Sequence, residues 1–146
     1  MKKIMLAAAI LFGSSAFAQH TKSHLDNYIN IKTALVNSDA KAAGMATGTF
    51  LEALKNDGDF TQKAALLKAA EKLSKTGDNL EKQRAAFNDV STAMWALVQG
   101  SDKVNQPVYY QYCPMKKSYW LSMEKDIKNP YYGSSMLTCG KVAETK

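Results

Sequence analysis

The stretch "LEKQRAAFNDVSTAMWALVQG", residues 80–100, decides how the chain folds. Its large apolar residues recur three, four or seven positions apart: Leu80, Phe87, Val90, Met94, Leu97 and Val98. This spacing places them on one face of an α-helix, and Gly100 is a residue type that commonly ends helices. We therefore predict an amphipathic helix that buries this face and ends at Gly100.

Helical spacing extends back along the chain to Lys22 and indicates three more amphipathic segments. Asp39 should cap the second helix, Thr61 should begin the third, and Asp78 should cap the fourth. The breaks between them, such as "NDGD" and "KTGD", are short and rich in helix-ending residues. The sequence therefore predicts a mainly α fold, an antiparallel up-down four-helix bundle over residues 22–100.

The inward faces of these helices indicate packing rather than chemistry. They carry many alanines, and Met45 and Met94 belong to the same apolar stripes, so we expect both methionines to fill the core. No pair of carboxylates or histidines recurs at i, i+4 on an inward face. We therefore expect a scaffold without a di-metal site.

The first residues have the pattern of a signal peptide. Lys2 and Lys3 precede an apolar run over residues 4–12, and Ala16-Phe17-Ala18 forms an A-x-A cleavage site. The run is shorter than the roughly 20 residues that span a membrane. We expect a signal peptide over residues 1–18, cleavage after Ala18, and a periplasmic protein without membrane insertion.

The mature chain, residues 19–146, has the length of a single domain. Removing Lys2 and Lys3 lowers the formal charge from +6 to +4, which gives no case for nucleic-acid binding.

From Ser101 to the end, residues 101–146, the composition changes. Six of the seven tyrosines lie between Tyr109 and Tyr132, and three prolines interrupt the same segment. We expect short strands over residues 108–112 and 134–140, with one or two helical turns over "SMEKDIK". The segment is too irregular to fold alone, so we expect its aromatic side chains to pack against the bundle.

The only two cysteines, Cys113 and Cys139, lie in this segment, each within three positions of a methionine, Met115 or Met136. The residues alone leave two interpretations open. In an oxidising compartment two cysteines normally pair. The bridge would close a loop of about 27 residues and would stabilise the folded state by roughly 3 kcal/mol. Alternatively, thiolate and thioether are soft donors that select Cu(I) over harder ions. Trp120 and the tyrosines, including Tyr112, would then shield the site.

Two other kinds of site have little support in the sequence. A structural zinc site normally needs four Cys or His ligands, and both histidines, His20 and His24, lie at the other end of the mature chain. We expect these two in a frayed N-terminal tail, with Cu(II) binding by His20 and the terminal amine as the alternative. The chain also lacks a CxxC motif and a nucleophile with a plausible base, so we predict no enzyme.

The motifs "VYYQYCPM", "YWLS", "IKNPYYG", "MLTCG" and the closing "VAET" resemble a family of unknown function among exported bacterial proteins, notably in Bacteroidetes. That family also occurs at the C-terminus of periplasmic adaptors of copper and silver efflux pumps. The matching positions are Cys113, Pro114, Met115, Trp120, Asn129, Pro130, Gly133, Met136, Cys139 and Gly140.

The resemblance implies an exported protein associated with heavy-metal handling, and it moves the interpretation of the cysteines toward metal. On this basis we expect a periplasmic chaperone or buffer that binds Cu(I) or Ag(I) through Cys113, Cys139 and Met115 or Met136. Its partners would be periplasmic components of a heavy-metal efflux system. The alternative is a non-catalytic partner-binding module whose C-terminal segment is stapled by a Cys113–Cys139 disulfide.

Overall fold

The computed structural model describes residues 15–146. In chain order its elements are α1 (Ser15–Val36), α2 (Ala40–Asn56), α3 (Lys63–Ser74), α4 (Leu80–Gln99), β1 (Tyr109–Cys113), β2 (Ser118–Ser122), the 3₁₀ helix η1 (Gly133–Ser135) and β3 (Lys141–Thr145). The prediction of a mainly helical chain with four helices and short C-terminal strands is confirmed. Most of the predicted signal peptide lies outside the described residues, and its last positions, 15–18, begin α1.

Local capping explains where the helices begin and end. The Asp39 side chain accepts the Ala42 N–H at 2.9 Å and caps α2 as predicted. Asn79, rather than Asp78, caps α4 by accepting the Lys82 N–H. The third helix begins at Lys63, later than predicted, because Gln62 before it has a left-handed conformation (φ 77°).

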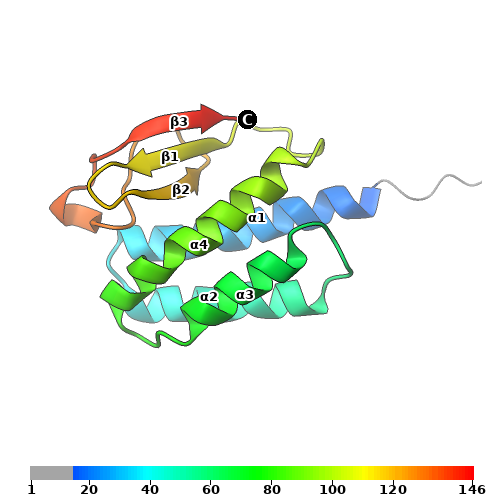
Figure 1. Ribbon diagram of the computed structural model, residues 1–146, viewed down its shortest axis with the longest axis horizontal. Coiled ribbons are helices and arrows are strands. Elements are labelled where there is room, and N and C mark those ends of the chain that lie inside the picture. Colours follow the sequence, from blue (N-terminus) through cyan, green and yellow to red (C-terminus); the bar gives the residue numbers. More distant parts are fainter. Residues whose placement is uncertain (1–14) are drawn as a thin grey trace, which may run out of the picture.

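The molecule has three layers (Figure 1). The α1–α4 pair lies in the middle, with α2 and α3 on one side and the sheet on the other. Apolar residues from all four helices and from the sheet form one continuous core. Met94 is buried in this core as predicted, whereas the prediction for Met45 is wrong because its side chain is 68% exposed.

The sheet has the order β2-β1-β3, and both pairings are antiparallel. The strand predicted over residues 108–112 corresponds to β1. Residues 134–140 form η1 and a turn instead of the predicted strand, and β3 begins just after them. No helix forms over residues 122–128, where the carbonyls of Glu124 and Lys125 accept hydrogen bonds from the buried Gln111 amide, at 3.1 and 3.0 Å.

The outer edge of β2 is closed by helix side chains. The Tyr119 N–H donates to Asn88 Oδ1 of α4 at 2.8 Å, and the Leu121 N–H donates to Tyr28 Oη of α1 at 3.0 Å. Tyr28 Oη also lies 2.7 Å from Ser91 Oγ on α4. Two backbone amides that would otherwise be free at a sheet edge therefore fix the sheet to both central helices.

Aromatic stacking adds to this attachment. Trp95 of α4 stacks on Tyr110 of β1, with ring centroids 4.7 Å apart, and Tyr110 stacks on Tyr119 of β2 at 4.6 Å. The expected packing of C-terminal aromatic side chains against the helices is present here. Among the described helices, none combines the length and the apolar character needed to cross a membrane.

Candidate functional site

The sheet brings the two cysteines together although 26 positions separate them in the sequence. Cys113 is the last residue of β1, and the register pairs its neighbour Tyr112 with Lys141, the first residue of β3. The two residues before Lys141, Cys139 and Gly140, therefore lie beside the end of β1. The two strand ends are the elements that position the thiols.

Gly140 permits this close approach. Its φ of 150° is one that side-chain-bearing residues rarely adopt. A Cβ atom there would lie 2.8 Å from Trp120 Cη2 and 3.0 Å from the Tyr112 carbonyl oxygen. A larger residue would therefore push β3 away from β1 and separate Cys139 from Cys113.

Asn129 fixes the backbone that carries Cys139. The fully buried side chain donates from Nδ2 to the Cys139 carbonyl at 2.7 Å. The backbone N–H of Asn129 donates to the Leu137 carbonyl at 2.8 Å. Its Oδ1 accepts the Tyr131 N–H at 2.8 Å. One side chain thus joins the turn after Pro130 to the loop before β3.

Both cysteines are free thiols, and they lie close enough for Cys113 to affect the pKa of Cys139. Cys113 is fully buried, whereas Cys139 is partly exposed. Loss of solvation, together with the neighbouring Cys113 thiol, raises the pKa of Cys139 above its ordinary value. A cation bound by Cys139 would therefore have to displace the proton of that thiol.

The two methionines are placed differently from the thiols. Met115 lies in the turn between β1 and β2 and is 62% exposed, while Met136 follows η1 and is 37% exposed. The Met136 carbonyl accepts the Cys139 N–H at 3.1 Å, which ties Met136 to the thiol segment through the backbone. The structure thus gathers the two thiols and leaves both thioether side chains toward solvent.

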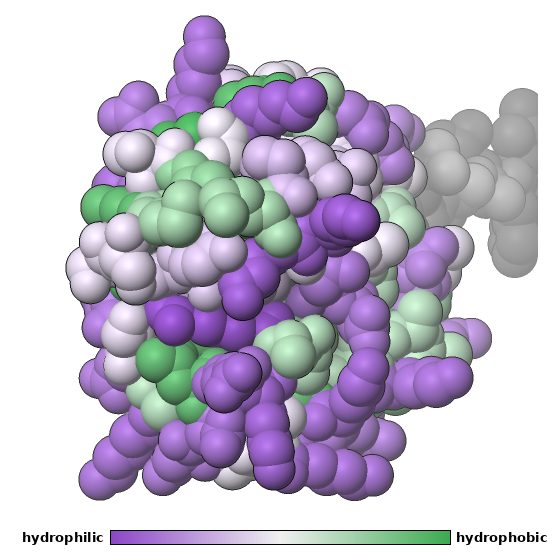
Figure 2. All heavy atoms as spheres, turned by 60° about the vertical axis from the view of Figure 1, so that its left-hand side comes forward, coloured by the Kyte–Doolittle hydropathy of each residue, from purple (hydrophilic) through white to green (hydrophobic). Residues whose placement is uncertain are grey.

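Figure 2 shows the end of the molecule that contains the turn between β1 and β2 and η1. Weakly hydrophobic side chains form a patch on its upper half, bordered by hydrophilic ones. The large apolar side chains exposed in this part of the chain are those of Met115, Met136 and Leu137. This end of the molecule therefore exposes two thioether side chains on a partly apolar surface.

Trp120 and Tyr112, the residues expected to shield the site, occupy opposite faces of the sheet. Successive side chains of a strand alternate between its faces, and the register pairs Trp120 with Gln111, two positions before Cys113. Trp120 is fully buried on the same face as Cys113, and its ring reaches Gly140. Tyr112 points to the other face, where its ring lies 4.6 Å from that of Tyr119.

A second polar cluster lies around Asp57, at the C-terminus of α2. His20 Nδ1 is 2.6 Å from Asp57 Oδ1, and His24 Nε2 is 2.8 Å from Asp57 Oδ2. The expectation of a frayed tail is wrong for His24, which is only 3% exposed and stacks on Phe60 at 5.3 Å. Burial alone would raise the pKa of Asp57, but the hydrogen bonds and histidines outweigh it and lower that pKa.

This His–Asp cluster borders a pocket of about 750 Å³ between the start of α1, the α2–α3 loop and the segment after α4. The second ring nitrogen of His24, Nδ1, is buried in that pocket wall and has no hydrogen-bond partner among the described residues. Across residues 15–146, no group of three or more His, Cys, Asp or Glu side chains is arranged to hold a metal ion.

The helical part of the chain matches a family model. The match covers residues 25–106 and is described as "Protein of unknown function (DUF3347)". The chain belongs to this family. The matched region contains α2, α3, α4 and the part of α1 from residue 25 onward, and it ends before β1, so the cysteine motifs lie outside it. No curated protein and no solved structure matches the chain.

Asp57 and the side chain of Asn129 have roles in the structure that the sequence did not predict. "NDGD" was interpreted only as a helix break, and nothing local connects Asp57 with His24, 33 positions earlier. Asn129 did carry a signal, because an Asn-Pro step followed by Gly133 indicates a turn. The hydrogen bond from its side chain to Cys139 is a long-range contact that this signal does not contain.

Proposed function

We propose that this chain is an exported, non-catalytic protein that binds one Cu(I) or Ag(I) ion through Cys113 and Cys139. One observation carries the proposal: two free thiols lie close together at the end of the sheet, and one of them is partly exposed. Two soft sulfur ligands suit a monovalent soft cation, which needs fewer ligands than zinc does. The ion is cargo in this account, rather than a resident cofactor.

Met136 or Met115 would supply a third, thioether ligand. Met136 is better supported, since its carbonyl already bonds the Cys139 amide. Both side chains are solvent-facing and unbranched, so either can change rotamer to reach the thiols without disturbing the core. Thioethers also stay unprotonated at low pH, which would soften the loss of affinity as the thiolates take up protons.

We further propose that the protein acts in the periplasm as a copper or silver chaperone or buffer, after cleavage behind Ala18, and that it serves a heavy-metal efflux system. The charged and apolar pattern of residues 2–18 and the resemblance of the C-terminal motifs support this assignment. The scaffold would be the up-down bundle. This arrangement is supported by the packing of helices adjacent in sequence against each other and of α1 against α4.

A non-catalytic partner-binding module stapled by a Cys113–Cys139 disulfide is the second candidate. It is favoured by the same proximity, because two cysteines on neighbouring strand ends can be bridged when their Cα atoms lie within about 7 Å. In that case the exposed Met115, Met136 and Leu137 would be contact residues for a protein partner.

An anaerobic titration of the reduced protein against a competing Cu(I) chelator tests the proposal. The variants are Cys113→Ser, Cys139→Ser, Met136→Leu and Met115→Leu. Loss of an outer-shell residue costs metal sites about 10–100-fold in affinity, so each serine variant should lose at least about 100-fold. One leucine variant should show a smaller loss.

Equal affinity in all five proteins would end the metal-site proposal. If the fully reduced wild type fails to bind at all, the disulfide-stapled module becomes the better account.

A further inference from the structure

The two thiols of the pair differ in their access to solvent. Cys113 is fully buried at the end of β1, while Cys139 lies in the loop before β3 and is partly exposed. A dissolved reagent can therefore reach Cys139 without any change in the fold, whereas Cys113 becomes accessible only when the sheet opens.

We propose that Cys139 is a site of covalent modification by small-molecule disulfides, and that Cys113 resolves the adduct by closing a Cys113–Cys139 bridge. The register that pairs Tyr112 with Lys141 places Cys113 beside the loop that carries Cys139, so the resolving thiol lies near the modified one. Asn129 holds the Cys139 backbone in this position.

The chemistry is a two-step thiol–disulfide exchange. Cys139 loses its proton to solvent, and its thiolate attacks one sulfur of a disulfide RS–SR. A Cys139–SR bond forms, the RS–SR bond breaks, and the second sulfur leaves as RS⁻. Cys113 then loses its proton and attacks Cys139 Sγ, which forms the protein disulfide and expels the remaining RS⁻. The protein gives up two electrons, and one disulfide is reduced to two thiols.

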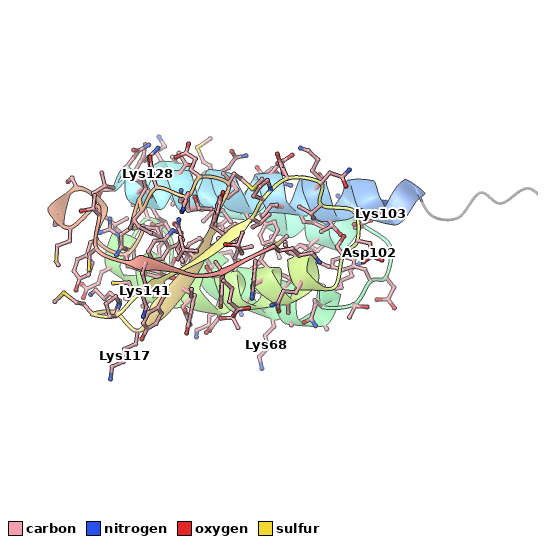
Figure 3. All side chains as sticks on the ribbon, turned by 90° about the horizontal axis from the view of Figure 1, so that it is seen from above. Lys68, Asp102, Lys103, Lys117, Lys128 and Lys141 are labelled. Carbon is pink, nitrogen blue, oxygen red and sulfur yellow. The ribbon has the colours of Figure 1, made fainter. Side chains whose placement is uncertain are left out.

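The surroundings of the pair favour an anionic reagent. Lys117 and Lys141 project from the same end of the molecule as the thiols, and Lys141 directly follows Gly140 (Figure 3). Positive side chains around a site raise the local concentration of anions. Oxidised glutathione, which is anionic at neutral pH, is therefore the appropriate probe, and the uncharged hydroxyethyl disulfide is its control.

This modification would regulate the proposed metal site, and in that respect it rests on the proposed function. A pair with glutathione on Cys139 keeps one thiol and a bridged pair keeps none, so neither offers the two thiolates proposed to bind Cu(I). The thiol–disulfide exchange itself involves no metal. The protein can therefore bind Cu(I) without undergoing the exchange, or undergo the exchange without binding Cu(I).

The experiment is an intact-mass time course of the reduced, metal-free full chain with oxidised glutathione. The wild type should pass through a single adduct and end two hydrogens lighter than it began. Cys113→Ser should stop at one glutathione on residue 139. Cys139→Ser should remain unmodified while folded and react only after denaturation.

Brief alkylation of the reduced wild type, followed by peptide mapping, makes the same comparison without a variant. We expect Cys139 to be labelled at least about tenfold faster than Cys113, since only accessible thiolates react in the folded state. Equal labelling of the two cysteines, or modification of folded Cys139→Ser as fast as Cys113→Ser, would overturn the proposal. Equal modification rates with the anionic and the uncharged disulfide would show that Lys117 and Lys141 do not attract the reagent.

Discussion

Asp57 is the residue whose surroundings depart furthest from what its neighbours in sequence suggest. Its carboxylate accepts hydrogen bonds from His20, His24 and the Gly58 N–H, at 2.6, 2.8 and 2.8 Å. An ionised carboxylate can only accept hydrogen bonds, so the charged form fits this environment and the protonated form does not. The cluster therefore joins the start of α1 to the end of α2.

We predict that Asp57→Asn destabilises the protein by about 1–3 kcal/mol at pH 7, the usual effect of leaving buried polar groups unsatisfied. Asp59→Asn is the matched control, because Asp59 is exposed and lies two positions away. Urea unfolding at unchanged m-value gives both free energies. If the control loses as much stability as Asp57→Asn, the loss is due to the removal of a negative charge and not to the disruption of the His–Asp cluster.

The same substitution should change the acid sensitivity of the fold. The pKa of Asp57 is lowered in the folded state, so its contribution to stability is fully present above the ordinary value of 3.8 and is lost as pH falls through the folded pKa. The difference in free energy of unfolding between wild type and Asp57→Asn should therefore become smaller below about pH 4. A difference that stays constant down to pH 2 would contradict the assignment.

Sequence could not have found this residue cluster. His20 and His24 are close in sequence, and their spacing of four positions was evident. Their partner lies on a different helix, and short-range patterns contain no information about which helix ends meet. The proximity of Cys113 and Cys139 was predictable to a greater extent. Each cysteine has a methionine nearby, and turn-forming residues flank both.

At the scale of secondary-structure elements, β2 depends on its two helix contacts. A Tyr28→Phe substitution keeps the ring, which stacks on Phe87 at 5.1 Å, and removes only the hydroxyl that accepts the Leu121 N–H. We expect a loss of about 1–3 kcal/mol, because the buried amide is left without a partner. Tyr132→Phe, which removes a hydroxyl from a partly buried ring under Lys116, should cost less than about 0.5 kcal/mol.

Urea unfolding with both variants gives these two free energies, and amide hydrogen exchange at Leu121 locates the effect. The exchange should accelerate in Tyr28→Phe and stay unchanged in Tyr132→Phe. Equal stability losses in the two variants, with Leu121 still protected, would refute the assigned role of Tyr28.

The helices were predictable and the sheet only in part, for a physical reason. Helix formation depends on contacts three and four positions apart, which the apolar spacing and caps such as Asp39 record directly. A strand depends on partners elsewhere in the chain. The stretch "SYWLS" becomes β2 because Asn88 and Tyr28 accept its amides, and "SMEKDIK" is not helical because its carbonyls serve Gln111.

In the whole molecule the two polar sites lie at opposite ends. Lys117, Lys128 and Lys141 project near the thiol end, whereas Asp102 and Lys103, which line the pocket beside His24, lie at the other end (Figure 3). The thiol end offers the sulfur atoms of the two cysteines and the two methionines, and the pocket end offers imidazole and carboxylate. The donor atoms around a bound metal therefore report directly which end holds it.

X-ray absorption spectroscopy of the protein loaded anaerobically with one equivalent of Cu(I) is the most direct test of the metal-site proposal. The account predicts a first coordination shell made of sulfur alone, with two or three sulfur atoms, that is lost in Cys113→Ser and in Cys139→Ser. It also predicts an unchanged spectrum for His24→Ala, which alters only the other end. A first shell of nitrogen or oxygen in the wild type, or a sulfur shell that survives in both serine variants, would contradict the account.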